Sequence, residues 1–251
     1  MTSVEKRDVL VVGAGFGGLY SLHLLRESGF HVSAVERGSG VGGTWYWNRY
    51  PGARCDVESL QYSYSFDDDL QQEWEWTERY AGQPEILRYA EHVAERFDLA
   101  DLIDFDTNVE SMSYDSTTQK WAVSTNRCTY EAAFVVAATG CLSAANLPEF
   151  PGLETFEGDV YHTGRWPHEQ VDFTGQRVGI IGTGSSAVQA IPVIASEAAE
   201  LTVFQRTPNF SLPQRNGPLD PKDQRDWKAC LLYTSPSPRD QRGSGMAGCA
   251  C

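Results

Sequence analysis

The sequence is poor in basic residues and has no long apolar run. Its 20 Lys and Arg stand against 34 Asp and Glu, a formal charge of −14, and no basic cluster interrupts this excess of acid. Nucleic acid and anionic membranes are therefore not expected partners. No apolar run reaches the length of a membrane span and the N-terminus lacks a signal-peptide core, so we expect a cytoplasmic protein.

Cysteine is also scarce and shows no ordered spacing. The six cysteines lie at positions 55, 128, 141, 230, 249 and 251, which fits neither a metal-ligand pattern nor a disulfide framework. We therefore expect reduced thiols and no metal site. With 251 residues, of which 41% are hydrophobic, the chain can form one large or two small globular domains.

The first informative stretch is a strand, a glycine-rich turn and a helix near the N-terminus. An apolar run, Val9–Val12, stops at Gly13–Gly18 (GAGFGG), and an amphipathic helix follows. The next strand, His31–Val35, ends on Glu36. In this arrangement a pyrophosphate binds at the helix N-terminus, and the carboxylate of Glu36 accepts hydrogen bonds from the ribose hydroxyls. Because the carboxylate would repel a 2′-phosphate, we expect FAD or NAD rather than NADP here.

The same pattern recurs in the second half of the chain. A strand, Gln176–Ile181, leads into Gly182–Ala187 (GTGSSA) and a helix, and the strand Leu201–Gln205 ends on Arg206. Arg206 follows the first glycine of its turn by 24 residues, and Glu36 follows that of its own turn by 23, so the two are equivalent. A guanidinium pairs bidentately with phosphate, so the second turn is expected to select NADPH over NADH.

Between these units the sequence predicts a long loop, a helix and a set of short strands. The glycine-rich and aromatic stretch 38–47 is expected to be a loop that holds Trp45 and Trp47 against a flavin ring, the alternative being a surface loop with an aromatic staple. A helix begins near Gln83 and Pro84. Short strands are expected at Phe105–Thr107, Val109–Tyr114 and Trp121–Ser124, and a central parallel strand at Phe134–Ala138.

Two further runs resemble one enzyme family. Gly42–Asp56 is similar to the GGxWxxxxYPGxxxD signature, and Phe156–Pro167 to the FxGxxxHxxxWP fingerprint, of Baeyer–Villiger monooxygenases of the phenylacetone and cyclohexanone monooxygenase type. The resemblance implies an FAD- and NADPH-dependent enzyme that uses dioxygen, through a C4a-peroxyflavin, to convert a ketone into an ester or lactone. It implies an α/β fold with two Rossmann-like dinucleotide-binding units, an FAD unit with inserted helices and a β-meander and then the start of an NADPH unit.

The resemblance also assigns roles to single residues. Asp56 would orient an essential arginine near the flavin and nicotinamide, and Arg54 and Asp56 would contact NADP. Tyr62 would contact the flavin, the backbone at Val109 would meet the adenine side of FAD, and His162 would have a structural and hinge role. Asp56 is the predicted catalytic residue. The predicted cofactor-binding residues are Gly13, Gly15, Phe16, Gly18, Glu36, Thr44, Trp45, Tyr46, Trp47, Arg54, Asp56, Tyr62, Val109, Gly182, Thr183, Gly184, Ser185, Ser186, Ala187, Gln189, Arg206 and Thr207.

Domain boundaries follow from the same motifs. We expect an incomplete FAD-binding domain at 1–145, a linker at 146–170, an incomplete NADPH-binding domain at 171–229 and an artefactual or disordered tail at 230–251. The family's chains are longer, and their second half would carry the substrate pocket and the essential arginine. We therefore expect these 251 residues to be inactive alone. The alternatives are an N- or S-oxygenating flavin monooxygenase and a non-enzymatic flavin-binding remnant.

Overall fold

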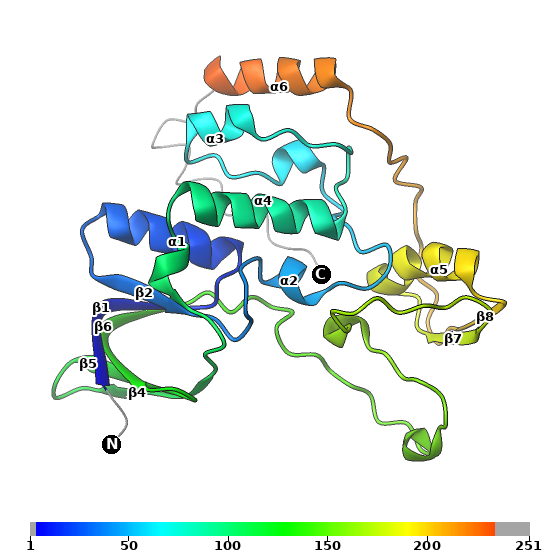
Figure 1. The fold of residues 1–251 in the computed structure, drawn as a ribbon, viewed down its shortest axis with the longest axis horizontal. Coiled ribbons are helices and arrows are strands. Elements are labelled where there is room, and N and C mark those ends of the chain that lie inside the picture. The colour runs from blue at the N-terminus through cyan, green and yellow to red at the C-terminus, as the bar shows by residue number, and fades with distance from the viewer. Residues whose placement is uncertain (1–3, 234–251) are drawn as a thin grey trace. The chain divides into compact units, whose positions relative to one another are not determined.

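The computed structural model describes residues 4–233, which fold into two compact units (Figure 1). Of the described residues, the first unit contains 4–54 and 82–212, and the second contains 55–81 and 213–233. Both glycine-rich turns lie in the first unit, so these units do not follow the boundaries expected from the sequence. The division into an FAD-binding and an NADPH-binding part stays a prediction.

A six-stranded mixed sheet forms the base of the first unit. Its order is β3-β2-β1-β6-β5-β4, parallel from β3 to β6 and antiparallel from β6 to β4. The strands are β1 (Val4–Val12), β2 (Val32–Val35), β3 (Ile103–Asp104), β4 (Val109–Asp115), β5 (Lys120–Thr125) and β6 (Thr129–Ala137). The predicted return of the chain as a central parallel strand is confirmed by β6, which lies between β1 and β5. The α/β class with a β-meander is likewise confirmed.

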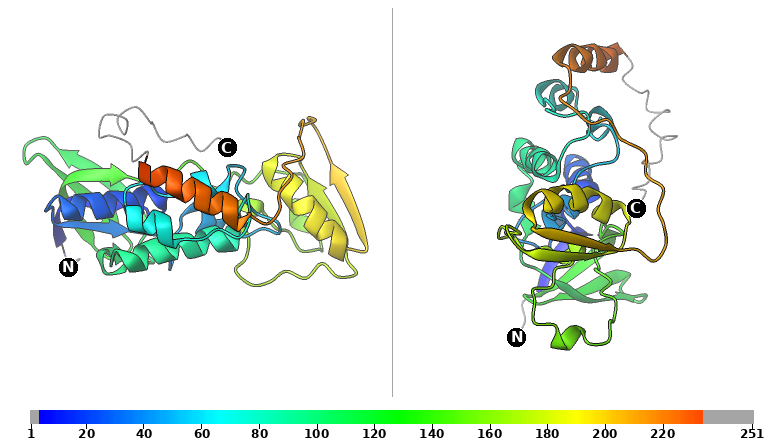
Figure 2. Two further views of the ribbon diagram at one scale, coloured as in Figure 1. Left: turned by 90° about the horizontal axis from the view of Figure 1, so that it is seen from above. Right: turned by 90° about the vertical axis from the view of Figure 1, so that its right-hand side faces the viewer.

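Apolar side chains cover both faces of β1. Val9 and Val11 pack with Leu19 and Leu22 of α1 (Phe16–Glu27) and with α4 (Gln83–Arg96). Figures 1 and 2 show both helices on this face of the parallel strands. On the opposite face, Leu10 joins a second buried cluster formed by β2, β5 and β6. Burial on both faces explains why the strand reads as an unbroken apolar run rather than an alternating one.

Two predicted elements differ from the structure. The stretch expected as loop contains a short helix, α2 (Thr44–Trp47), because the backbone N–H groups of Trp45 and Tyr46 bond back to Gly42 and Gly43. The strand expected at 105–107 is absent, and β3 ends at Asp104. Asp106 has φ +52°, which turns the chain out of the extended conformation. The helix predicted from Gln83 is confirmed by α4, with Pro84 in its first turn.

The second strand–turn–helix pattern forms a two-stranded parallel sheet with one helix. It consists of β7 (Arg177–Ile181), α5 (Ser185–Glu197) and β8 (Glu200–Phe204). The helix covers one face of the sheet through a buried cluster that includes Ala190 and Ile194. Between β6 and β7, residues 138–176 form two short 3₁₀ turns, η3 (Leu153–Thr155) and η4 (Thr163–Arg165), in an otherwise irregular path.

The second unit is built from helices. It contains η1 (Ser59–Gln61), α3 (Asp68–Glu73) and α6 (Pro221–Tyr233). The Gln224 side chain accepts a hydrogen bond from the Trp76 backbone at 2.8 Å, and the Lys228 ammonium donates to the Gln72 carbonyl at 2.7 Å. These contacts join α6 to the segment that contains α3.

The predicted tail begins inside α6 rather than after it. The helix continues through Tyr233, because residues 228–233 (KACLLY) contain neither glycine nor proline to end it. The rest of the predicted tail, 234–251, lies outside the described residues. Of the helices within residues 4–233, none combines the length and the apolar character needed to cross a membrane.

Candidate cofactor sites

The first glycine-rich turn packs three backbone segments together. Gly13 adopts φ +104°, and its N–H donates to the Val35 carbonyl at 2.9 Å. A Cβ placed on Gly18 would lie 1.9 Å from the Gly13 oxygen, and one placed on Gly43 would lie 2.8 Å from the Gly15 Cα. α1 then begins at Phe16 with Gly15 as its N-cap and no capping side chain. The turn thus leaves the first backbone N–H groups of α1 without a capping side chain.

Glu36 lies at this turn, as its position in the sequence predicts. The residue is 6% exposed. One carboxylate oxygen accepts a hydrogen bond from the Ala14 N–H at 2.8 Å, and the other accepts from the Gly38 N–H at 2.8 Å. A carboxylate has about four lone-pair sites, so about two remain for further donors. Glu36 can therefore hold the turn and still accept hydrogen bonds from two ribose hydroxyls.

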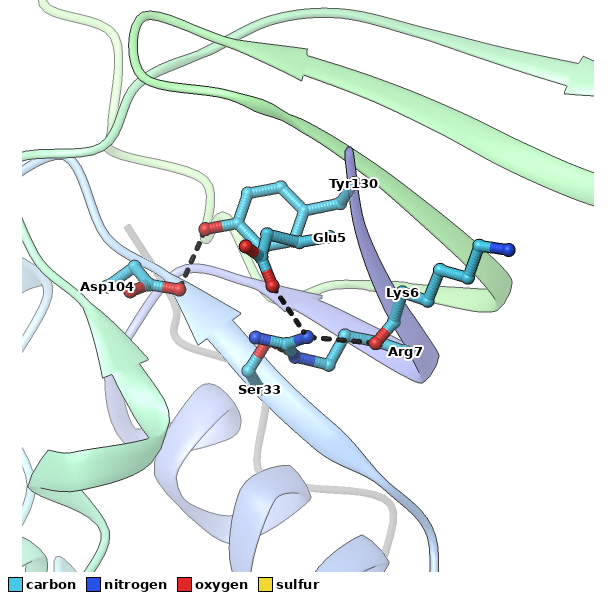
Figure 3. Close-up of polar contacts among 6 residues, drawn as sticks. All are labelled: Glu5, Lys6, Arg7, Ser33, Asp104 and Tyr130. Carbon is cyan, nitrogen blue, oxygen red and sulfur yellow. Dashed lines mark hydrogen bonds and ion pairs between the residues drawn. The ribbon is translucent and has the colours of Figure 1, made fainter. Parts of the chain in front are cut away.

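A hydrogen-bonded pair that the sequence analysis missed, buried Tyr130 and half-buried Asp104, supports the backbone of Glu36. The Tyr130 hydroxyl on β6 donates to the Asp104 carboxylate on β3 at 2.7 Å (Figure 3). The Asp104 carbonyl accepts the backbone N–H of Glu36 at 3.0 Å. Burial, together with the hydrogen bond to Asp104, raises the pKa of the Tyr130 phenol above its ordinary value. No local pattern marks this pair, because the two residues are 26 positions apart.

The raised pKa of Tyr130 predicts a loss of stability at high pH. Because the folded state holds the phenol protonated, its contribution is complete below the unfolded-state pKa of about 10 and is lost as the pH rises above it. We expect Tyr130→Phe to lower the free energy of unfolding by about 1–3 kcal/mol at neutral pH. Above about pH 10, the variant should lose stability less steeply than the wild type.

Urea unfolding at several pH values measures both effects. Tyr114→Phe on β4 is the matched control, because Tyr114 is 50% exposed and should contribute to neither. The same slope above pH 10 in Tyr130→Phe as in the wild type would contradict the assignment.

The aromatic residues of α2 differ in their surroundings. The Tyr46 ring lies against the glycine-rich loop, so that a Cβ on Gly38 would be 2.6 Å from it. The Trp47 ring lies 4.7 Å from the Arg37 guanidinium. Trp45 is 8% exposed and its carbonyl accepts a hydrogen bond from the Gln83 side chain, so protein already covers its ring. Contact of Trp45 and Trp47 with a flavin stays a prediction.

The second glycine-rich turn repeats the geometry of the first. Gly182 has φ +104°, and its N–H donates to the Phe204 carbonyl at 2.9 Å. α5 then begins with Gly184 as its N-cap and again no capping side chain. The segment after β8 follows the turn: the Gln205 side chain donates to the Thr183 hydroxyl at 3.1 Å, and the Asn209 side chain donates to the Thr183 carbonyl at 2.8 Å.

Arg206 therefore lies on a segment fixed beside the second turn. The Thr183 hydroxyl reaches the carbonyl of Thr207 at 3.4 Å, so the neighbours of Arg206 on both sides contact Thr183. Arg206 itself is exposed. Ser185, Ser186 and Ala187 form the first turn of α5, as predicted.

Other predicted site residues lie elsewhere. The Gln189 side chain on α5 bonds to residues 50 and 54. Asp56, which is exposed, and Tyr62 belong to the second unit, and the start of β4 contains Val109. His162 caps η4, where its ring accepts a hydrogen bond from the Gly164 N–H at 3.1 Å. The cofactor and catalytic roles of all these residues stay predictions.

Comparison with known proteins shows where the chain belongs. A family model described as pyridine nucleotide-disulphide oxidoreductase matches residues 10–222. An acetone monooxygenase (methyl acetate-forming) of Gordonia sp. (strain TY-5) is 46% identical over 226 residues, which cover 90% of this chain and 42% of that protein. A Baeyer–Villiger monooxygenase of Pseudooceanicola batsensis is 48% identical over 224 residues, which cover 88% of this chain and 41% of that protein. A phenazine N-monooxygenase of Lysobacter antibioticus is 45% identical over 208 residues, which cover 82% of this chain and 38% of that protein.

Solved structures give the same result. An oxidized steroid monooxygenase bound to NADP has a TM-score of 0.87 at 57% identity and covers 91% of this chain and 44% of that one. A structure of OTEMO in complex with FAD and NADP has a TM-score of 0.86 at 40% identity, and the match covers 90% of this chain and 44% of that one. The chain spans about two fifths of the length of the curated relatives it matches. The chain is thus similar, over about two fifths of their length, to Baeyer–Villiger-type flavoprotein monooxygenases, which confirms the recognition from runs 42–56 and 156–167. By the family model that matches residues 10–222, the chain belongs to the pyridine nucleotide-disulphide oxidoreductase family.

Proposed function

We propose that this chain supplies the FAD-binding site and the first part of the NADPH-binding site of a monooxygenase that converts ketones into esters or lactones. The observation that carries the proposal is the pair of matching turns, each with a first glycine at φ +104° that donates to a strand-end carbonyl at 2.9 Å. Glu36 is held at the first turn by two hydrogen bonds, and Arg206 lies on the segment beside the second turn. The acetone monooxygenase at 46% identity, and a cyclohexanone 1,2-monooxygenase of Acinetobacter sp. at 44%, are named for ketones and support the substrate class.

The first turn fits the diphosphate and ribose of FAD. A Cβ at Gly18 would fill the space that the turn needs, and the start of α1 offers N–H groups that no side chain caps. Glu36 keeps lone pairs for the ribose hydroxyls. Bound there, FAD would accept a hydride from NADPH and activate dioxygen for insertion beside the ketone carbonyl.

The second turn fits the phosphates of NADPH. Thr183 precedes the N-cap of α5, and Ser185 and Ser186 begin the helix, whose first N–H groups no side chain caps. Arg206 and Thr207 would face the 2′-phosphate, because the bonds to Thr183 hold this segment beside the turn.

The remaining predicted residues would position the reactants. Tyr46 packs against the backbone at Gly38, Gly40 and Gly42 and would keep this loop beside the cofactor. Asp56 is our candidate for the catalytic residue, since an exposed carboxylate can hold a guanidinium at the reacting carbonyl and stabilise its developing negative charge through that partner.

A second candidate function is N-oxygenation. The phenazine N-monooxygenase supports it, because that protein is 45% identical to this chain and is named for the oxygenation of nitrogen. Products from a ketone and from phenazine, tested in parallel on the whole protein that carries this chain, would distinguish the two. We expect ester or lactone from the ketone, whereas N-oxide alone would favour the alternative.

Cofactor binding by the 251-residue chain tests the proposed sites directly. We expect the chain to retain FAD through gel filtration and to bind NADPH, with folding checked by circular dichroism. We expect no ester from cyclohexanone, because the chain matches about two fifths of each relative. A folded chain that binds neither FAD nor NADPH would contradict the proposal, and release of ester would show that these residues suffice.

A further inference from the structure

The side-chain amide of Gln189 joins α5 to a loop from the first half of the chain. Its oxygen accepts hydrogen bonds from the Tyr50 hydroxyl at 2.9 Å and from the Arg54 N–H at 3.3 Å. Its nitrogen donates to the Arg54 carbonyl at 3.1 Å. These three bonds link positions that are 135 to 139 residues apart. Both lone pairs of the amide oxygen are used in this way, while the nitrogen has one further N–H.

Backbone packing holds the same loop against α5. Gly52 has φ +75°, and a Cβ placed on it would lie 2.3 Å from the Gln189 carbonyl oxygen. Any other residue at this position would separate the loop from the helix. The Tyr50 ring packs against the buried cluster formed by Ala190 and Ile194 of α5. Residues 50–54 thus contact the helix through side chains and through the main chain.

Hydrogen bonds continue from this loop to the aromatic residues beside the first turn. The Ala53 carbonyl accepts the backbone N–H of Gln83 at 2.8 Å, and the Gln83 side chain donates to the Trp45 carbonyl. Gln83 begins α4 and Trp45 lies in α2. A continuous set of bonds therefore runs from Gln189, in the helix that starts at the second turn, to the segment that follows the first.

We infer that Gln189 is a positioning residue, which fixes the 50–54 loop on α5 so that the two nucleotide sites keep one relative arrangement. This inference rests on the proposed function, since it assigns α5 to the NADPH site. It goes beyond a role as nucleotide ligand, because most of the hydrogen-bonding capacity of the amide is directed at Tyr50 and Arg54. This amide holds the main chain of Arg54, whose contact with NADP the family resemblance implies.

The test uses the 251-residue chain and three variants, Gln189→Leu, Tyr50→Phe and the double variant. The first measurement is amide hydrogen exchange at Arg54 without any nucleotide. We expect exchange to be faster by about two- to tenfold in Gln189→Leu, because its acceptor is lost. Val188→Ala, one position earlier on α5 and exposed, is the matched control and should leave exchange unchanged. Unchanged exchange at Arg54 in Gln189→Leu would overturn the inference.

The second measurement is the dissociation constant of NADPH. We expect Gln189→Leu and Tyr50→Phe each to weaken binding, and the double variant to be no weaker than Gln189→Leu, because the two residues act through one bond. Weak NADPH binding by Gln189→Leu beside unchanged exchange at Arg54 would make Gln189 a direct ligand and would overturn the positioning role. If the wild-type chain binds no NADPH, the proposed function fails, while the exchange measurement still decides the positioning role.

Discussion

Gly18→Ala is expected to destroy the first nucleotide site and to destabilise the fold. The new methyl group would lie 1.9 Å from the Gly13 oxygen and 2.9 Å from the Gly13 carbonyl carbon, both backbone atoms that cannot rotate away. The turn must therefore open, which separates α1 from the end of β1. We expect the free energy of unfolding to fall by about 1–3 kcal/mol or more, and retention of FAD to be lost.

Gly17→Ala provides a matched control one position earlier. A Cβ at Gly17 meets no atom within 4 Å, and the residue lies in the same helix. Because Gly17 lies in the first turn of α1, replacing it by alanine should raise stability by at most about 0.5–1 kcal/mol. Chemical denaturation and flavin absorbance after gel filtration measure the two effects. Equal FAD retention by both variants would mean that close packing at Gly18 does not form the site.

Arg206→Ala is expected to change which nicotinamide nucleotide the chain prefers. A guanidinium paired with the 2′-phosphate contributes about 1.5–3 kcal/mol, so NADPH binding should weaken by about ten- to a hundredfold. NADH lacks that phosphate, and its affinity should change little. Titration of the 251-residue chain with each nucleotide gives the two dissociation constants.

Arg177→Ala controls for the loss of one positive charge. Arg177 is exposed at the start of β7, whereas Arg206 follows the carboxyl end of β8. Since β7 and β8 are parallel, Arg177 lies at the amino ends of the two strands, whereas the glycine turn follows the carboxyl end of β7. An unchanged ratio of NADPH to NADH affinity in Arg206→Ala would remove Arg206 from the proposed role.

Errors of the sequence analysis occurred where distant backbone groups compete for a segment. Residues 105–107 were expected to be a strand, but the N–H of Asp106 donates to Gly38 and that of Thr107 donates to Glu36. These bonds hold the segment beside the 36–38 loop, so it cannot extend β3. The short helix α2 was missed for a similar reason, because two positive-φ glycines, Gly42 and Gly43, set its start.

The amino-acid sequence by itself determined both strand–turn–helix units, together with Glu36 at the first turn and Arg206 after the second. These features are local: glycine spacing and apolar runs act within about 25 residues, so a linear pattern can encode them. Only the tertiary structure decided that Tyr130 and Asp104 support Glu36, and that Gln189 bonds to the 50–54 loop. Those contacts depend on how strands pair and how a helix packs on a distant loop, and no local residue pattern specifies them.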